Sequence, residues 1–270
     1  MEKVFSKVAI SVAFFLIIAV LSSQSAFSQS VWTQDFENRS KAGIEFMVPS
    51  YSFTGDQRGV DFATYFYTNI PVSKTWSVKI VFPISRFNGG GSKLSSGNPF
   101  IGFQYFSPNS GFKLDFGARL PTIQQNQFGS HLFSETFSAY GVGAFNAVKT
   151  AVRFNIHYQW NSESNWVYKV SQGLEAVAPS HGPLAVVYKF YGQALYKVND
   201  NFSVGAGLEG DLLTDRNHYL FPARKRIQLG LIGQYDFGRL DVGAYMKDNL
   251  SFVFDNEPNL VIGLNFGVSL

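Results

Sequence analysis

The sequence predicts an all-β protein: a transmembrane, antiparallel, up-and-down β-barrel of about twelve strands. First, apolar and polar residues alternate along most of the chain after residue 40, which is the period of a β-strand. Second, short and long connectors separate the alternating tracts in turn. Third, aromatic residues make up 17% and charged residues 15% of a chain whose mean hydropathy is +0.00. Since a soluble domain carries roughly 25% charged residues, we expect segregated faces, with the aromatic side chains toward lipid.

The composition excludes several classes of site and partner. The chain contains no cysteine, so it has neither a disulfide framework nor a thiolate zinc site, and 4 histidines offer little for a metal centre. Lys and Arg number 22 against 19 Asp and Glu, which leaves no large positive excess for phosphates. We therefore expect no cofactor, no metal and no nucleic-acid partner.

Residues 1–28 have the pattern of a secretory signal peptide. Lys3 and Lys7 precede an uncharged apolar run over 8–21, and Ala26 to Ser28 form a small-x-small cleavage site. The alternative is an N-terminal membrane anchor, but the run is shorter than the roughly 20 residues of a spanning helix. We expect cleavage after Ser28, a periplasmic segment at 29–40, and a barrel over 41–270 in the bacterial outer membrane. Its expected partners are outer-membrane lipid, lipopolysaccharide and the barrel-assembly machinery.

The strands follow from alternation along the chain. At 151–160, the apolar set from Val152 to Trp160 lies opposite Arg153, Asn155 and His157. The tract 260–270 alternates in the same way up to Leu270. In chain order, the expected strands are 41–52, 60–71, 74–86, 98–107, 111–120, 151–160, 164–176, 184–196, 200–212, 223–236, 238–247 and 260–270. Each is near the 9 to 11 residues that a tilted strand needs to cross a bilayer.

The connectors favour a membrane barrel over a secreted soluble β-protein with an apolar interior. They are tight near 72–73, 107–110, 162–163, 199–201 and 237, and longer at 53–59, 87–97, 122–148, 177–183, 213–222 and 248–257. Short periplasmic turns and long extracellular loops are typical of outer-membrane barrels. Aromatic residues near the ends of the apolar faces, Trp76, Tyr158, Trp160 and Tyr196, suit interfacial girdles.

The longest connector, 122–148, is expected to act as a lid or plug. It contains five aromatic residues, Phe128, Phe133, Phe137, Tyr140 and Phe145, which are poorly suited to free exposure in a loop. The stretch 136–148 could form a strand of its own, but one added strand would make the number odd. We therefore interpret the segment as a long loop, or as an extension of the following strand, that gates the barrel mouth.

The polar face of the strands is the candidate functional surface. Ionised groups are costly against lipid and tolerable in a wet lumen, so this face should point inward. The residues expected to line a pathway are Lys79, Lys113, Asp115, Arg119, Arg153, His157, Lys169, Lys189, Glu209, Asp211 and Arg226, and the same face carries Glu45, Asp61, Glu175, Asp241 and Lys247. The alternative is a salt-bridge network that fills the interior. Twelve strands lie between small filled barrels and wide open pores, so both interpretations remain.

Enzymatic chemistry has little support. Residues 205–210 match GxGxxG formally, but no helix opens there, as a dinucleotide site requires. An outer-membrane lipid hydrolase of the His-x-Ser type needs a serine two residues after a histidine, and none of the four histidines has one. We therefore expect no catalytic residue, and a lipid-modifying enzyme is the least favoured class.

A resemblance to a known family begins at residue 97. The stretch 97–105, a tight turn, and the stretch 111–122 ending in Leu120, Pro121 and Thr122 resemble a hairpin of the outer-membrane transporters associated with meta-pathway phenol degradation. Asn98 stands where that family has an acid. The resemblance implies a small barrel that passes small, aromatic or hydrophobic solutes. A structural or surface-interaction barrel with a filled lumen is the alternative function.

Overall fold

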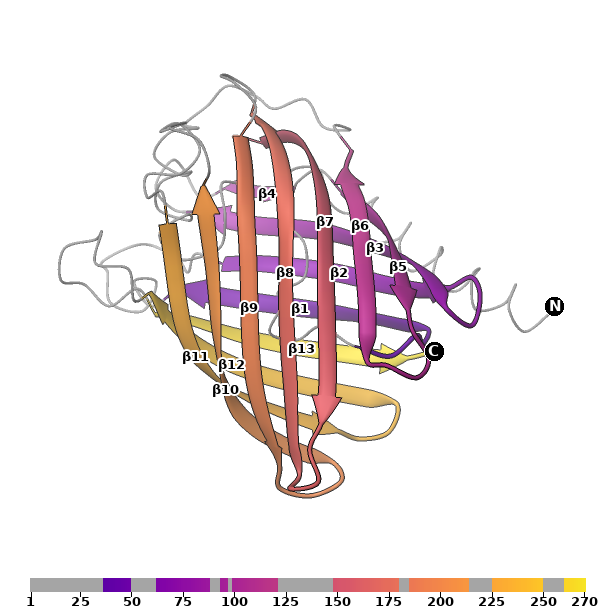
Figure 1. Ribbon diagram of the computed structural model, residues 1–270. Coiled ribbons are helices and arrows are strands. Elements are labelled where there is room, and N and C mark those ends of the chain that lie inside the picture. Colours follow the sequence, from indigo (N-terminus) through magenta and orange to yellow (C-terminus); the bar gives the residue numbers. More distant parts are fainter. Residues whose placement is uncertain are drawn as a thin grey trace.

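The computed structural model describes residues 36–49, 62–87, 93–96, 99–120, 148–179, 185–213, 225–249 and 260–270. Within them the chain forms strands joined by turns (Figure 1). No helix in this part of the chain is long and apolar enough to cross a membrane. The expected signal peptide, 1–28, lies outside the described residues, as do residues 29–35 of the expected periplasmic segment.

The described residues contain thirteen strands. They are β1 (Lys41–Pro49), β2 (Phe62–Pro71), β3 (Trp76–Phe87), β4 (Lys93–Ser96), β5 (Phe100–Phe106), β6 (Phe112–Arg119), β7 (Val148–Asn161), β8 (Trp166–Pro179), β9 (Ala185–Lys197), β10 (Phe202–Leu213), β11 (Lys225–Asp236), β12 (Leu240–Asn249) and β13 (Val261–Ser269). Every pairing is antiparallel.

The sheet closes into a twelve-stranded barrel, which confirms the predicted fold class. Apart from β4, each strand pairs with the strands next to it in the chain, with β3 followed directly by β5, and β1 pairs with β13 to close the barrel. The additional strand, β4, is four residues long. It pairs with β3, which also pairs with β5. Pro83 lies on β3 between these two pairings and has no amide hydrogen to donate to a ladder. The short β4 lies within 87–97, which was expected to be a connector.

Tight turns join the strands at one end of the barrel, and their residues explain their geometry. Gly111 and Gly238 adopt left-handed backbone angles, with φ of 63° and 87°, and Asn165 does so with φ of 64°. In the turn between β9 and β10, the Asn199 side-chain oxygen accepts hydrogen bonds from the amides of Asn201 and Phe202. Left-handed backbone angles and side-chain hydrogen bonds therefore stabilise the short connectors at this end of the barrel.

The two faces of the wall differ as alternation predicts. Along β13, Val261, Gly263, Asn265 and Gly267 are buried, whereas Ile262, Leu264, Phe266 and Val268 are exposed. The outward side chains are mostly apolar, and Val152 is 61% exposed. An exposed apolar wall around a polar interior is the reverse of a soluble barrel and matches a transmembrane one.

Aromatic side chains meet near the tight turns. Tyr158 and Trp160 lie with ring centroids 5.6 Å apart, and Trp160 stacks on Tyr168 at 5.2 Å. Trp166 continues the contacts to Tyr196, at 5.3 Å. Such a belt at one end of an apolar wall suits the boundary between lipid and water.

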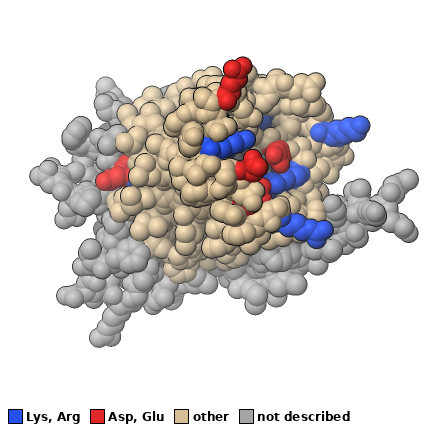
Figure 2. Space-filling model, turned by 90° about the horizontal axis from the view of Figure 1, so that it is seen from below, with Lys and Arg blue, Asp and Glu red and all other residues tan. Residues whose placement is uncertain are grey.

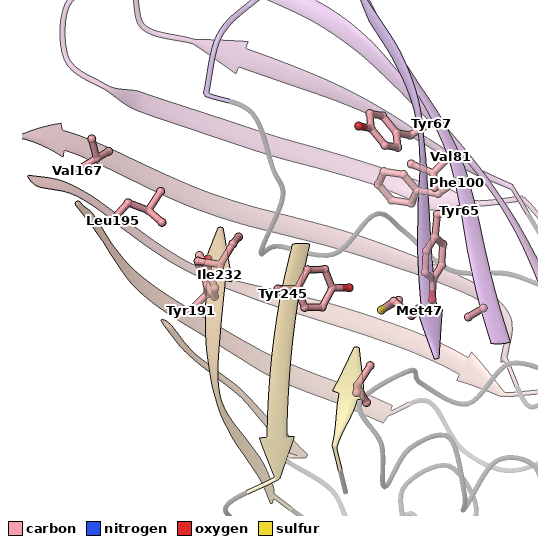
Figure 3. Packing of buried hydrophobic residues seen from close by; sticks show 12 residues of the cluster. Met47, Tyr65, Tyr67, Val81, Phe100, Val167, Tyr191, Leu195, Ile232 and Tyr245 are labelled. Atoms are coloured by element: carbon pink, nitrogen blue, oxygen red, sulfur yellow. The ribbon is translucent and has the colours of Figure 1, made fainter. Parts of the chain in front are cut away.

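The interior also contains an apolar cluster, so the expectation that the aromatic side chains face lipid was only partly right. Figure 3 shows Tyr65, Tyr67, Phe100, Tyr191 and Tyr245 packed inside the wall. The hydroxyl of Tyr67 donates to Asn265 Oδ1 at 2.9 Å, and the hydroxyl of Tyr245 donates to Glu45 Oε1. Tyrosine suits this position because it fills space and still offers a polar group to the lumen.

Candidate functional site

The candidate site is the lumen, and the strands place most of the predicted residues there. Lys79, Lys113, Asp115, Arg119, Arg153, His157, Lys169 and Glu209 are all buried inside the wall, as are Glu45, Glu175 and Lys247. Lys189 and Asp241 are partly exposed. Asp211 and Arg226 are register partners on β10 and β11, but their side chains lie outside the described set. Asp61 and the expected gate residues Phe128, Phe133, Phe137, Tyr140 and Phe145 also lie outside it, so the gate stays a prediction.

The first charge group lies on β6 and β7. The register sets Lys113 opposite His157 and Asp115 opposite Asn155. Residues two apart on a strand share a face, so Asp115 lies between Arg153 and His157 on the inner surface. The distance from Asp115 Oδ2 is 3.8 Å to Arg153 Nη2 and 4.0 Å to His157 Nε2.

The second group joins β6, β8 and β9 around Glu175. Its Oε1 lies 3.5 Å from Arg119 Nε, and its Oε2 lies 2.8 Å from Lys189 Nζ. Arg119 reaches over β7 to make this contact, since β6 and β8 are not direct neighbours. One buried carboxylate therefore offsets two cations on this wall.

The facing wall, β10 to β1, carries its own polar contacts. Lys247 Nζ on β12 donates to Glu209 Oε1 on β10 at 2.9 Å. Tyr245 donates its hydroxyl to Glu45 Oε1 at 2.7 Å. These contacts tie strands that are two apart, which stiffens the wall from inside.

The segment 36–40, just before β1, is anchored at the mouth with the tight turns. Asn38 Nδ2 donates to the Ser73 carbonyl in the turn between β2 and β3, at 2.9 Å. Asn69 Nδ2 donates to the Arg39 carbonyl at 2.8 Å. Arg39 Nη2 lies 3.9 Å from Asp241 Oδ1.

Phe36 extends this segment to the far wall. Its ring contacts His157 on β7 edge to face, with centroids 6.0 Å apart. Because β1 pairs with β2 and β13, contact with β7 means that the segment crosses the mouth. Sequence reasoning missed Phe36, since a single aromatic residue ahead of the first strand carries no periodic signal.

The crossing segment borders two cavities. The larger, of about 310 Å³, and the smaller, of about 20 Å³, are both lined by Glu37, Arg39 and Lys41. The larger reaches Gln159 and Lys169 on the wall, and its volume is near the lower end of small-molecule sites. Figure 2, a view from below, shows acidic and basic side chains side by side in the middle of a largely uncharged face.

The described part of the lumen offers polar groups that can bind a solute. Buried polar atoms without a hydrogen-bond partner include the Asp115 carboxylate oxygens, His157 Nε2, Gln104 Nε2 and both Gln193 amide atoms. Groups of this kind can bind water or a polar solute. Within the described ranges, no three His, Asp or Glu side chains are grouped to hold a metal ion.

Comparisons of sequence find no relative. No family model matches the chain. No curated protein matches it either.

Comparisons of structure find outer-membrane barrels. An outer-membrane channel from Pseudomonas putida F1 matches with a TM-score of 0.61 and 10% identity, over 91% of this chain and all of that one. The translocator domain of the autotransporter NalP from Neisseria meningitidis matches with a TM-score of 0.52 and 12% identity, over 88% and 90% of the two chains. The NanC porin matches at 0.50 with 8% identity, over 85% and 98%. The chain is therefore a closed, antiparallel twelve-stranded barrel of the outer-membrane type.

Proposed function

We propose that this protein is an outer-membrane channel that passes small aromatic or hydrophobic solutes through its charge-lined lumen. The observation that carries the proposal is a polar interior, inside an apolar outer wall, that opens on a cavity of about 310 Å³ at one mouth. Two structural neighbours, a channel and a porin, support the same class. The aromatic part of the proposal rests on the resemblance of 97–122 to the phenol-degradation transporters.

The proposal includes delivery to the bacterial outer membrane by a signal peptide cleaved after Ser28, with insertion by the barrel-assembly machinery beside lipopolysaccharide. It includes no enzymatic activity. Mass spectrometry of protein purified from outer membranes tests the cleavage, and a mature chain that begins at residue 29 is the expected result.

Planar-bilayer recording and liposome swelling test the channel. We expect a small conductance from the wild type, because the segment 36–40 narrows one mouth. The double variant Asn38→Ala with Asn69→Ala removes two of its anchoring hydrogen bonds and should raise the conductance modestly but measurably. Asn109→Ala, in an exposed turn, is the matched control. No conductance and no solute entry from either protein would contradict the proposal.

A filled structural barrel is the second candidate, and the buried ion pairs and interior tyrosines favour it. On that view, Lys113→Ala and Arg153→Ala lower the stability of the barrel and leave solute entry at the background level of empty liposomes. The same swelling assay separates the two functions, since the channel predicts that these variants also change the rate of solute entry.

A further inference from the structure

Phe36 places an aromatic ring among charged side chains of the lumen wall. Its ring centroid lies 5.6 Å from Lys169 Nζ and 5.7 Å from Lys113 Nζ. The imidazole of His157 meets the same ring edge to face. We call the group formed by Lys113, His157 and Lys169 the ring site. Its residues lie on three adjacent strands, β6, β7 and β8. The ring that occupies it, Phe36, belongs to the segment before β1.

The ring site is built to hold an aromatic ring strongly. Lys113 is 2% and Lys169 is 8% exposed, so both ammonium groups are largely shielded from water. A cation over an aromatic face is worth about 0.5 to 2 kcal/mol, with the higher values at desolvated sites. Lys113 Nζ also lies 5.4 Å from the centroid of the Phe106 ring, so it lies near two aromatic rings.

The charge around the ring site favours an anion. The buried charged side chains of β6 to β8 are Lys113, Arg119, Arg153 and Lys169 against Asp115 and Glu175. Four bases and two acids leave an excess of positive charge on this part of the wall. A phenyl ring meets this excess only through its quadrupole, whereas a ring with a carboxylate also offers a charge-assisted hydrogen bond.

The ring site is reachable from the turn-side mouth. Phe36 and Lys169 both line the cavity of about 310 Å³, together with the amide side chains of Gln159 and Asn161. A solute in this cavity can therefore meet Lys169 without displacing the anchors of the segment at Asn38 and Asn69.

We propose that the ring site binds small aromatic carboxylates, and that Phe36 is the chain's own occupant, which such a solute displaces. This inference rests on the proposed channel function, because it names the class of solute that the lumen recognises. While Phe36 occupies the ring site, a solute cannot bind there. The apparent affinity for the solute is therefore the intrinsic affinity multiplied by the fraction of molecules whose ring site is empty. The segment thus competes with the solute in addition to narrowing the mouth.

Isothermal titration of the detergent-solubilised full chain with sodium benzoate tests the inference. Phe36→Ala and Phe36→Leu remove the competing ring and should each raise the affinity about 5-fold, which corresponds to a cation–π contribution near 1 kcal/mol. Lys169→Gln should lower the affinity at least 5-fold. Wild-type protein should bind benzoate more tightly than cyclohexanecarboxylate, which keeps the charge, or benzyl alcohol, which keeps the ring.

Matched controls separate the ring site from general effects. Phe116→Ala removes a ring from the lipid face of β6, and Lys74→Gln removes a charge from an exposed turn, so neither should change benzoate binding. Circular dichroism checks that each variant keeps its strands. Unchanged or weaker binding in both Phe36 variants, or equal binding of benzoate and cyclohexanecarboxylate, overturns the inference.

The titration needs no transport, so the two proposals fail separately. Conductance without benzoate binding, even in Phe36→Ala, refutes the ring site and leaves the channel. Benzoate binding without conductance or swelling refutes the channel and supports the ring site.

Discussion

Interior tyrosines of the barrel lie over glycines of neighbouring strands. A Cβ on Gly263 would overlap the ring of Tyr245, and a Cβ on Gly43 would overlap that of Tyr67. Both tyrosines donate to side chains of the lumen, namely Glu45 and Asn265. At these positions glycine lets the ring lie flat against the backbone, so that the hydroxyl reaches its acceptor.

Gly263→Ala should therefore destabilise the barrel. The added methyl group forces the Tyr245 ring away and weakens its hydrogen bond to Glu45, and overpacking of this kind costs about 1 to 3 kcal/mol. Urea unfolding followed by tryptophan fluorescence measures the change. Gly192→Ala is the matched control, because a Cβ there meets no atom within 4 Å. Equal midpoints for the two variants would show that the ring does not depend on the glycine.

At the scale of the strands, charge on one wall is balanced by few carboxylates. Glu175 on β8 neutralises both Arg119 on β6 and Lys189 on β9. Arg119 and Glu175 are buried, whereas the side chain of Lys189 is 37% exposed. Loss of the carboxylate would thus leave one guanidinium buried beside a partly hydrated ammonium.

Glu175→Gln should lower the free energy of unfolding by about 3 kcal/mol. That value is at the lower end for a broken buried pair, because water screens part of the Lys189 charge. It should also shift the reversal potential in a salt gradient toward anions, since the lumen loses a negative charge. Glu163→Gln, in an exposed turn, should change neither quantity. An unchanged reversal potential would argue that ions do not pass this wall.

The strands themselves were largely predictable, because each has one face toward the lumen. All twelve wall strands lie within a few residues of the expected tracts, and β7 begins at Val148 instead of 151. The short β4 was not predictable, since four residues are too few for a period to show. The ring site was predictable only in part: alternation placed Lys113, His157 and Lys169 inward, but the contact of Phe36 with them depends on tertiary structure alone.

At the scale of the whole molecule, the barrel has two mouths, and the described residues cover one of them with the segment 36–40. The segment 36–40 crosses the mouth with the tight turns, and the connector between β6 and β7 joins strand ends at the other mouth. We predict that this connector is a second constriction. Two constrictions along one path act as resistances in series, so the narrower one limits the current.

Deletion of 124–144 and release of the segment by Asn38→Ala with Asn69→Ala should therefore combine more than additively. Each change alone should raise the single-channel conductance modestly, because the other constriction persists. The combined variant should exceed the sum of the two increments. Planar-bilayer recording of the three proteins measures this. If the segment variant alone reached the conductance of the combined variant, the 122–148 loop would be no barrier.

The unequal lengths of the strands affect the membrane around the protein. The described strands β7 and β8 have 14 residues each, whereas β1 and β13 have 9 each. At about 3.4 Å per residue and a tilt near 45°, these lengths give heights of roughly 34 Å and 22 Å. Lipid tails beside the junction of the two terminal strands would have to shorten, so the bilayer would thin along that one side of the barrel.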